Sequence, residues 1–386
     1  MKIGLVCYPT YGGSGVVATE LGKQFASQGH EVHFISYARP VRLSSFVENI
    51  YFHEVEMNSY PLFKYQSYGL SLTSKMLEVI EYEQLDLIHG HYAIPHAVSA
   101  YLTKQILRKN HVDIKIITTL HGTDITLVGL DPSFLPLLKF SIEESDGVTA
   151  VSEFLKQKTL MNYHIDKEIE VIHNFVDTEQ FKPIENERFR HHIAPNNERI
   201  LIHTSNFREL KRVPDIIRIL DLVKKVLPAK LVLIGDGPDR SECERLTREL
   251  HLQKDVIFLG KQDGLPELLS AADIFLMPSQ SESFGLAALE AMACGVPVVS
   301  SSVGGLPELN IHNQTGFIAE IGDIEIMAKY TLQLLQNEKR YTIFSQNARE
   351  RAAQHFDTRI VVPRYLDYYE KVLSGNKQDT MYRLSY

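Results

Sequence analysis

Residues 276–308 read LMPSQSESFGLAALEAMACGVPVVSSSVGGLPE, and this stretch decides the fold. An apolar strand ends at Pro278, a polar loop follows, and a helix is predicted to begin near Ser283 or Phe284 and to stop at Gly295. A strand, a loop and a helix in this order are typical of a parallel sheet. The amides of Phe284, Gly285 and Leu286 lie at the predicted helix start, where unpaired donors and the helix dipole suit an anion.

Two glutamates stand out in this stretch. Glu290 is surrounded by alanine, leucine, methionine and glycine, so we expect a buried carboxylate, which is costly without a partner. Two interpretations stay open for Glu290: it accepts hydrogen bonds from hydroxyls of a ligand, or it bonds a backbone amide in an ordinary core. Glu282 precedes the helix in the polar loop and would, considered alone, be a solvated acid.

The same rhythm of short β-branched runs and helical patterns extends through the rest of the chain. KIGLVCY, HEVHFISY, LDLIHGHY, IKIITTLH and GVTAVS occur in the first half, and RILIHTSN, AKLVLIGDG, DVIFLG, ADIFLMPS and VPVVSS in the second. Both halves are therefore predicted to be doubly wound α/β domains with parallel sheets. In such sheets ligands bind beyond the carboxyl ends of the strands, and two facing sheets would form an interdomain cleft.

The domain junction is placed near HNFVDTEQFKP, residues 173–183, a polar stretch between the two series of strands. The segment from Asp357 to Leu373 is predicted to be helical and to return to the first domain, with Pro363 kinking it or beginning a new helix. We therefore expect one domain of residues 1–170 plus about 357–386, and a second of residues 171–356.

Two further loops carry candidate residues. Residues 205–216, SNFRELKRVPDI, place Arg208, Lys211 and Arg212 after a strand, where they would neutralise a diphosphate or form a solvated basic loop. Residues 8–21, YPTYGGSGVVATEL, contain GSGVVA, which fits the glycine pattern of a dinucleotide-binding turn. An NADP-linked reductase stays open on this pattern. However, HEVHFISYARP lacks the terminal acid of an NAD site, and this reading does not explain Glu282 with Glu290.

Composition restricts the partners. The chain has 386 residues, is 44% hydrophobic and carries a formal net charge of -8, which disfavours general binding to nucleic acid or a membrane surface. No apolar run approaches a membrane span, and the first residues make a poor signal peptide, so we expect a cytoplasmic protein. Cys7, Cys243 and Cys294 have no metal-type spacing and are expected to be buried, reduced thiols.

The combined motifs resemble the retaining glycosyltransferases of family 4, which have the two-domain GT-B fold and use nucleotide diphosphate sugar donors. The motifs that carry the resemblance are GGSG in the first turn, HGTD at 121–124, HNFVD at 173–177, GDGP at 235–238, and E-x-F-G-L-x-x-x-E from Glu282 to Glu290. One position departs from the pattern, because Asn206 stands where many members have an arginine. Arg208 is the candidate to supply that missing charge.

The resemblance implies roles for individual residues. His121, Lys211 and Glu282 would act at the reaction centre: His121 beside the donor sugar, Lys211 against the leaving diphosphate and Glu282 on the sugar. Glu290 would hold the donor ribose. The remaining residues expected to bind the donor are Gly13, Asn206, Arg208, Gln262, Phe284, Gly285 and Leu286.

SNFRELKR, HGHY, TTLHGTD and PLFKYQ are similar to a narrower group in the family. That group transfers N-acetylglucosamine from UDP-N-acetylglucosamine to the hydroxyl of L-malate, in bacillithiol biosynthesis, with retained α configuration. The resemblance implies two small-molecule partners and no cofactor or metal, and self-association is compatible with the sequence. Candidates for binding the dianionic acceptor are Ser14, Lys64, Tyr92 and Thr119.

Alternatives remain at this point. UDP-glucose could replace the donor, another acceptor could replace malate, and the same architecture could serve a UDP-N-acetylglucosamine 2-epimerase or a protein that only binds a sugar nucleotide. His89, His91 and His96 in HGHYAIPH suggest a metal site, but their spacing spans a strand and a turn and no acid or cysteine set completes it. We therefore expect no metal there.

Overall fold

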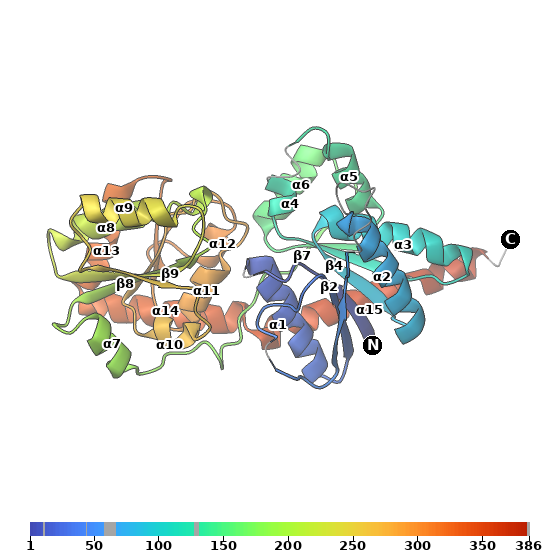
Figure 1. Ribbon diagram of the computed structural model, residues 1–386, viewed down its shortest axis with the longest axis horizontal. Coiled ribbons are helices and arrows are strands. Elements are labelled where there is room, and N and C mark those ends of the chain that lie inside the picture. Colours follow the sequence, from blue (N-terminus) through green and yellow to red (C-terminus); the bar gives the residue numbers. More distant parts are fainter. Residues whose placement is uncertain (11, 44, 58–66, 127–130, 384–386) are drawn as a thin grey trace. The chain divides into compact units, whose positions relative to one another are not determined.

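The structure is a computed structural model that describes the chain except for residues 11, 44, 58–66, 127–130 and 384–386, with side chains described as far as residue 375. The chain divides into two compact units (Figure 1). Unit 1 comprises Met1–His173 and Val361–Tyr386, and unit 2 comprises Asn174–Ile360. The junction thus falls in HNFVDTEQFKP, after His173 rather than after residue 170. The ligands that each unit binds stay predictions.

Unit 1 is built on a parallel sheet. Among the described residues this sheet has seven strands in the order β3-β2-β1-β4-β5-β6-β7. The strands are β1 (Lys2–Val6), β2 (Glu31–Ser36), β3 (Ile50–Glu54), β4 (Leu87–His91), β5 (Lys115–Leu120), β6 (Gly147–Ala150) and β7 (Glu170–Val171). The strands β4 and β5 are buried at every residue, which is expected for central parallel strands covered on both faces.

Alternate residues of these strands face different helices. Val6, Ile88 and Ile116 contribute to a core with Leu72 and Met76 of α2 (Tyr68–Glu83). The next helices in unit 1 are η1 (Ala93–Ala97, a π-helical turn), α3 (Val98–Lys109), α4 (Thr123–Thr126), α5 (Leu135–Glu143) and α6 (Glu153–Tyr163). The sheet is therefore covered on one face by α2 and α3, while residues such as His89, one position along β4, face the other side.

The helix α1 (Gly13–Ser27) follows β1 directly and depends on glycines for close packing. A Cβ at Gly15 would lie 2.5 Å from the carbonyl oxygen of Thr10, and a Cβ at Gly22 would lie 2.4 Å from the Phe34 ring. The GGSG turn therefore has a packing reason for one of its glycines that requires no dinucleotide. Gly13 differs, because a Cβ there would meet no atom within 4 Å.

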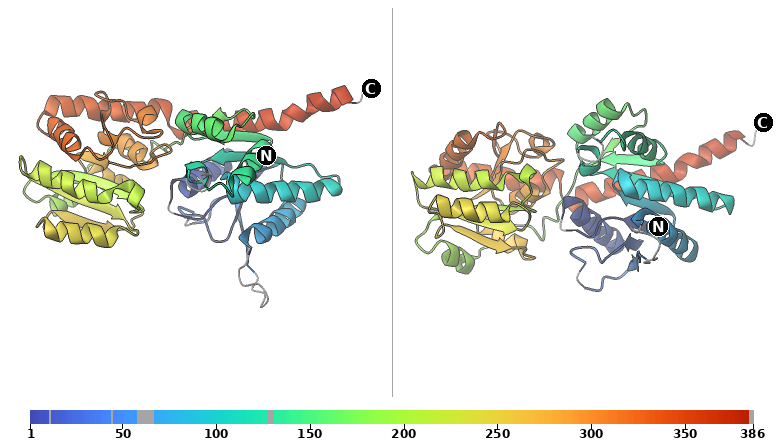
Figure 2. Two further views of the ribbon diagram at one scale, coloured as in Figure 1. Left: turned by 90° about the horizontal axis from the view of Figure 1, so that it is seen from above. Right: turned by 45° about the horizontal axis from the view of Figure 1, so that its top comes forward.

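The last helix, α15 (Thr358–Arg383), returns to the sheet of unit 1, which confirms the predicted C-terminal helix (Figure 2). The Tyr369 hydroxyl lies 2.5 Å from Nδ1 of His89, and the Val148 amide donates to the Tyr368 hydroxyl at 2.8 Å. Tyr365 and Tyr369 are fully buried. Pro363 lies inside this helix, so the alternative that it begins a new helix was wrong.

Unit 2 repeats the same arrangement. Its described residues form a six-stranded parallel sheet in the order β10-β9-β8-β11-β12-β13. The strands are β8 (Arg199–Ser205), β9 (Ala229–Gly235), β10 (Val256–Gly260), β11 (Ile274–Met277), β12 (Val298–Ser301) and β13 (Gly316–Ala319). In both sheets the first strand in sequence is central and the order reverses beside it, as in Rossmann-like folds.

Helices cover both faces of the second sheet. Figure 1 shows α8, α9 and α13 on one face of this sheet and α10 and α14 on the other. The helices of unit 2 are α7 (Glu187–Ile193), η3 (Glu209–Lys211, a 3-10 turn), α8 (Val213–Lys224), α9 (Arg240–Glu249), α10 (Leu265–Ser270), α11 (Leu286–Ala293), α12 (Leu306–Leu309), α13 (Ile324–Leu335) and α14 (Glu338–His355). The predicted pair of doubly wound α/β domains is confirmed.

The cysteines lie in these cores. Cys7, Cys243 and Cys294 are free and buried, and burial raises the pKa of each thiol to about 12. A thiol with so high a pKa is a poor nucleophile at neutral pH. Within the described residues, no helix has the length and apolar character needed to cross a membrane.

Candidate active site

In unit 2, the ends of β8 and β11 bring Lys211 and Glu282 together. Lys211 closes the turn η3 after β8, and its Nζ forms an ion pair with Oε1 of Glu282 in the loop after β11. The Ser279 hydroxyl donates to the same oxygen at 3.1 Å. The side chains are only 18% and 10% exposed, so the pair is largely shielded from water. Such shielding fixes both side chains and makes removal of either one costly.

The backbone of Glu282 is held by the loop that follows β12. The Gly305 amide donates to the carbonyl oxygen of Glu282 at 3.2 Å. Gly304 has a φ of +58°, and a Cβ there would lie 1.5 Å from that carbonyl oxygen. Only glycine therefore allows the loop after β12 to approach Glu282 this closely.

The helix α11 begins at Leu286, after Gly285 as its N-cap, which is slightly later than the predicted start at Ser283 or Phe284. Gly285 has a φ of +99°, a conformation that favours glycine and ends the preceding loop before the helix. No side chain caps this terminus and its first turn holds no acid. The amides of the first turn, from Leu286 onward, therefore have no partner within the helix and suit an anion.

Phe284 and Glu290 flank this terminus. The Phe284 side chain is buried and packs edge-on against Phe356, with ring centroids 5.4 Å apart, so it serves the core of unit 2. The ligand contact predicted for Phe284 concerned its backbone amide and stays a prediction. Glu290 is 4% exposed within α11, so the expected burial of this carboxylate is confirmed.

Three further predicted donor-binding residues, Asn206, Arg208 and Gln262, lie in loops of unit 2. Asn206 follows β8, and its Oδ1 is buried without a hydrogen-bond partner among the described residues. Arg208 is exposed, whereas Arg212 forms an ion pair with Asp215 at 2.6 Å. Gln262 is exposed, and its Nε2 donates to the carbonyl oxygen of Leu259 at 2.8 Å. Arg212 is therefore engaged within the protein, and Arg208 is the better placed of the two to meet an anion.

In unit 1, the first turn and the loop after β4 meet. The Ser14 hydroxyl, in the first turn of α1, lies 2.7 Å from the Tyr92 hydroxyl. The Tyr92 ring also lies 5.5 Å from the His121 ring and 5.6 Å from the Tyr8 ring. The start of α1 has no side-chain cap and no acid in its first turn, and Gly13 is exposed. Gly13, Ser14 and Tyr92 thus form one polar group near unpaired helix amides.

His121 follows β5 and is held in a buried row of rings. Its Nε2 lies 2.8 Å from Nδ1 of His91, and the two rings stack. Burial lowers the pKa of His121 to about 3, so its imidazole is neutral at neutral pH. Because Nε2 of His91 is buried without a partner, a proton there would be an unpaired donor, which is more costly than an unpaired acceptor. We therefore infer that His91 donates and that His121 accepts at Nε2.

Thr119 lies on β5, two residues before His121, and its side chain is buried. The hydroxyl of Thr119 lies 2.6 Å from Nε2 of His89 and 2.6 Å from the hydroxyl of Thr149, and the residue is fully buried. The Thr119 hydroxyl is therefore not exposed to a ligand. No acceptor contact is proposed for Thr119. The other predicted acceptor residue, Lys64, lies outside the described residues.

The three histidines of HGHYAIPH do not converge on one point. Both ring nitrogens of His89 face hydroxyls, those of Thr119 and Tyr369. Nδ1 of His91 faces His121, and Nδ1 of His96 donates to the carbonyl oxygen of His91 at 2.5 Å. Burial lowers the pKa of His89 to about 3 and that of His96 to about 4, so these rings are neutral polar members of the core.

Sequence reasoning did not assign a role to Asp124 in HGTD. Its Oδ2 accepts from the Ala93 amide at 2.9 Å and its Oδ1 from the Gly122 amide at 3.1 Å. Asp124 thereby joins the loop after β4 to the loop that carries His121. Burial raises the pKa of this carboxyl to about 6. An acid in the first turn of a short helix, four residues after a buried strand, is a signal that could have identified this residue.

The fold and these two groups of residues define a class of protein. Residues 184–351 match the family model of glycosyl transferases group 1, and residues 11–180 match that of glycosyltransferase family 4. The chain belongs to the family 4 glycosyltransferases and has the GT-B type of fold.

Individual relatives and a solved structure are also similar to the chain. The chain is 47% identical over 378 residues to the N-acetyl-alpha-D-glucosaminyl L-malate synthase of Bacillus anthracis, covering 98% of each chain. It is 30% identical over 309 residues to the D-inositol 3-phosphate glycosyltransferase of Mycolicibacterium smegmatis, covering 75% of this chain and 68% of that one. Among solved structures, HepE of Anabaena in complex with UDP and glucose aligns with a TM-score of 0.80 at 21% identity, covering 96% of this chain and 99% of that one. This last likeness concerns the fold alone.

Proposed function

We propose that the protein transfers N-acetylglucosamine from UDP-N-acetylglucosamine to the hydroxyl of L-malate. The observation that carries this proposal is the 47% identity over 98% of both chains to a synthase of that product. An identity of this level over the full length supports a shared substrate pair better than motifs that the whole family has. The site residues described above support the same assignment.

We assign the donor to unit 2. The uncapped start of α11 provides amides for the diphosphate, and Lys211 provides a cation for the charge that grows on UDP as it leaves. Glu282 holds that cation in place by the ion pair, and buried Glu290 is assigned to the ribose hydroxyls. These groups are fixed before the donor arrives, which is the condition for efficient electrostatic stabilisation.

We assign the acceptor to Ser14 and Tyr92 in unit 1, together with Gly13, which the family resemblance had placed with the donor. Malate has two carboxylates and one hydroxyl, and the free amides at the start of α1 suit a carboxylate. The Ser14 and Tyr92 hydroxyls offer further donors. His121 is assigned to the donor sugar, where a neutral imidazole can donate or accept a hydrogen bond.

The proposed reaction retains the α configuration. The bond between C1 of the sugar and the phosphate oxygen breaks, a bond from C1 to the malate oxygen forms on the same face, and the malate proton passes to the departing phosphate. Glu282 is engaged by Lys211, and Asp124 by two backbone amides, so neither carboxylate is placed as a nucleophile. The reaction as proposed uses no metal. The three buried thiols are consistent with the reducing cytoplasm as its location.

An acceptor comparison tests this proposal. Purified protein is incubated with UDP-N-acetylglucosamine and L-malate, succinate or no acceptor, and UDP and product mass are followed. Succinate is the matched control because it has both carboxylates but no hydroxyl. UDP release that requires L-malate, with a product of the sugar plus malate, is expected. Equal release in all three mixtures would refute the acceptor, and conversion of the sugar nucleotide without any acceptor would favour the epimerase.

A further inference from the structure

A group of ligand-type side chains lies at the edge of the sheet in unit 1, apart from the residues assigned to the reaction. His33 lies on β2, His53 on the edge strand β3, and Glu83 is the last residue of α2. In the parallel register Ile35 pairs with His53 and His33 pairs with Tyr51, so both histidines project from the same face of the sheet. Ile35 belongs to the core under α2, which places this face toward the helix that carries Glu83.

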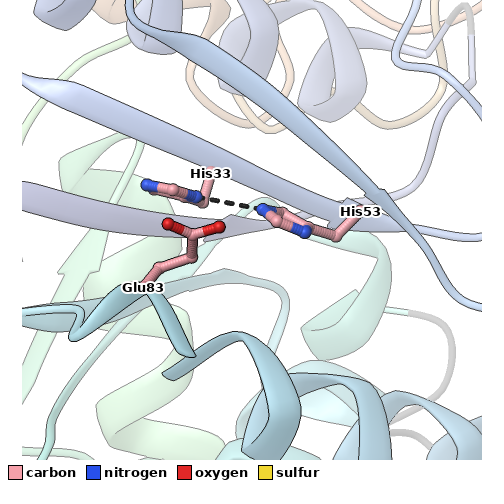
Figure 3. A group of neighbouring side chains, drawn as sticks. All are labelled: His33, His53 and Glu83. Atoms are coloured by element: carbon pink, nitrogen blue, oxygen red, sulfur yellow. Dashed lines mark hydrogen bonds between the residues drawn. The ribbon is translucent and has the colours of Figure 1, made fainter. Parts of the chain in front are cut away.

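The ligand atoms of these three residues converge. Nδ1 of His33 lies 3.0 Å from Nε2 of His53, and one atom of each residue lies within 4.8 Å of the other two. Figure 3 shows the two rings facing each other and the Glu83 carboxylate pointing toward them. Ligands about 2.1 Å from a tetrahedral ion are roughly 3.4 Å apart, so small side-chain movements would suffice for chelation.

Two lysines near His33 and His53 are paired with other acids. Lys75 forms an ion pair with Glu78 at 2.7 Å, and Lys2 with Glu31 at 3.3 Å. Within the described part of the chain, Glu83 makes no hydrogen bond or ion pair. The carboxylate and the two imidazoles together offer oxygen and nitrogen lone pairs that a cation can accept.

His33 is the buried member of this group of three residues. The residue is fully buried, and its Nε2 has no partner among the described residues. As for His91, we expect the proton of the neutral ring on Nδ1, facing Nε2 of His53, so a metal ion bound at Nδ1 would displace that proton and leave the ring protonated on Nε2. The His33 ring is held in place by stacking on Tyr51, with centroids 4.8 Å apart.

We propose that His33, His53 and Glu83 bind a divalent transition metal of the zinc type, which fastens the edge strand β3 to the end of α2. Two imidazole nitrogens and one carboxylate oxygen suit Zn²⁺, Co²⁺ or Ni²⁺ and do not suit Mg²⁺ or Ca²⁺, which prefer oxygen ligands. Three protein ligands leave a fourth position for water. His33 has no outer hydrogen-bond partner, and such partners strengthen sites by about 10–100-fold, so we expect a micromolar rather than nanomolar Kd.

The test uses the full-length protein freed of metal with a chelator, then titrated with Zn²⁺ alone and, separately, with Co²⁺. Binding of one Zn²⁺ per chain, tetrahedral Co²⁺ absorption bands and a higher Tm with Zn²⁺ are expected. Glu83→Gln should weaken Zn²⁺ binding at least about 10-fold, and His53→Gln should abolish it. Both changes affect partly exposed side chains, so the chain is expected to fold.

Two variants of exposed residues in unit 1 serve as matched controls. Glu81→Gln changes an exposed acid on the same helix, and His111→Gln changes an exposed histidine elsewhere in unit 1. Both should bind Zn²⁺ like the unchanged protein. The proposal is overturned if fewer than half of the folded chains bind Zn²⁺, or if His53→Gln and Glu83→Gln bind as tightly as the two controls.

Discussion

At the scale of single residues, the fold brings together pairs of side chains from distant parts of the sequence. Lys211 and Glu282 lie 71 residues apart in sequence, and Ser14 and Tyr92 lie 78 apart. Each pair is partly shielded from water, so each interaction is stronger than the same contact on an open surface. The consequences of removing one partner can therefore be measured.

The first prediction concerns Lys211. Lys211→Met removes the cation proposed to balance the leaving diphosphate and is expected to lower kcat by about 10²–10³, the usual cost of losing one such group. Lys211→Arg keeps the charge and should lose less. Steady-state kinetics with both substrates varied would measure this. A Lys211→Met enzyme with unchanged kcat would remove Lys211 from the mechanism.

The second prediction concerns the Ser14–Tyr92 hydrogen bond. Ser14→Ala and Tyr92→Phe are each expected to raise the KM for malate several-fold while changing the KM for the donor little. Since the two hydroxyls lie 2.7 Å apart, the double variant should lose less than the sum of the two single losses. Strictly additive losses, or a rise in the donor KM alone, would contradict the acceptor assignment.

At the scale of elements, the loops that follow the strands position the site, and some of them tolerate only glycine. The loop after β12 reaches the backbone of Glu282 because Gly304 has no Cβ. The start of α11 likewise depends on the left-handed conformation of Gly285. These are properties of backbone approach, which a sequence motif reports only as a glycine.

The third prediction separates backbone conformation from steric clash. Gly304→Ala would place a Cβ 1.5 Å from the carbonyl oxygen of Glu282, so the loop must move and donor binding should weaken by at least about 10-fold. Gly260→Ala is the control, because Gly260 also has a positive φ, of +69°, but open space around its Cβ. That control should cost only about 1 kcal/mol of stability. Calorimetry would measure the UDP affinity of both variants, and thermal unfolding would measure their stability. Equal UDP affinity of the two variants would contradict the prediction.

At the scale of the whole molecule, the two units share one topology but differ in their buried histidines. Burial lowers the pKa of His89 and His121 to about 3 and that of His96 to about 4 in unit 1. In unit 2, burial lowers the pKa of His203 to about 4. The two units are therefore expected to respond differently to acid.

The fourth prediction is a loss of folding stability as the pH falls below about 6.5. A histidine whose folded-state pKa is below its unfolded value of about 6.5 costs no stability above that pH, because both states are neutral. Between pH 6.5 and the folded pKa the unfolded state binds the proton, so stability falls by about 1.4 kcal/mol per pH unit for each group. At pH 5 each of these four histidines costs about 2 kcal/mol of stability, and three of the four lie in unit 1.

Amide hydrogen exchange at pH 7.5 and pH 5, corrected for intrinsic rates, would measure this difference. The strands β4 and β5 of unit 1 are expected to lose protection at pH 5 before β8 and β9 of unit 2. Earlier loss in β8 and β9, or equal loss in both units, would contradict the prediction.

The sequence predicted much of this molecule and missed a definable part. Both doubly wound domains and the C-terminal helix followed from the patterns of apolar residues and were confirmed. The buried thiols followed from the cysteine spacing, and the burial of Glu290 from its apolar neighbours, and both were also confirmed. The inward turn of Thr119 was missed because it depends on the strand face and on helix α15, which lies far away in sequence. The group of His33, His53 and Glu83 was missed for the same reason, since only the register of β2 with β3 brings it together.

The identity of the glycosylated product tests the central claim most directly. Protein, UDP-N-acetylglucosamine and L-malate are incubated, and the isolated product is analysed by mass spectrometry and by the coupling of its anomeric proton in NMR. The account predicts one product, with the mass of N-acetylglucosamine joined to malate with loss of water, and with the small coupling of an α linkage. A β-linked product, or no product containing malate while UDP accumulates, would contradict it.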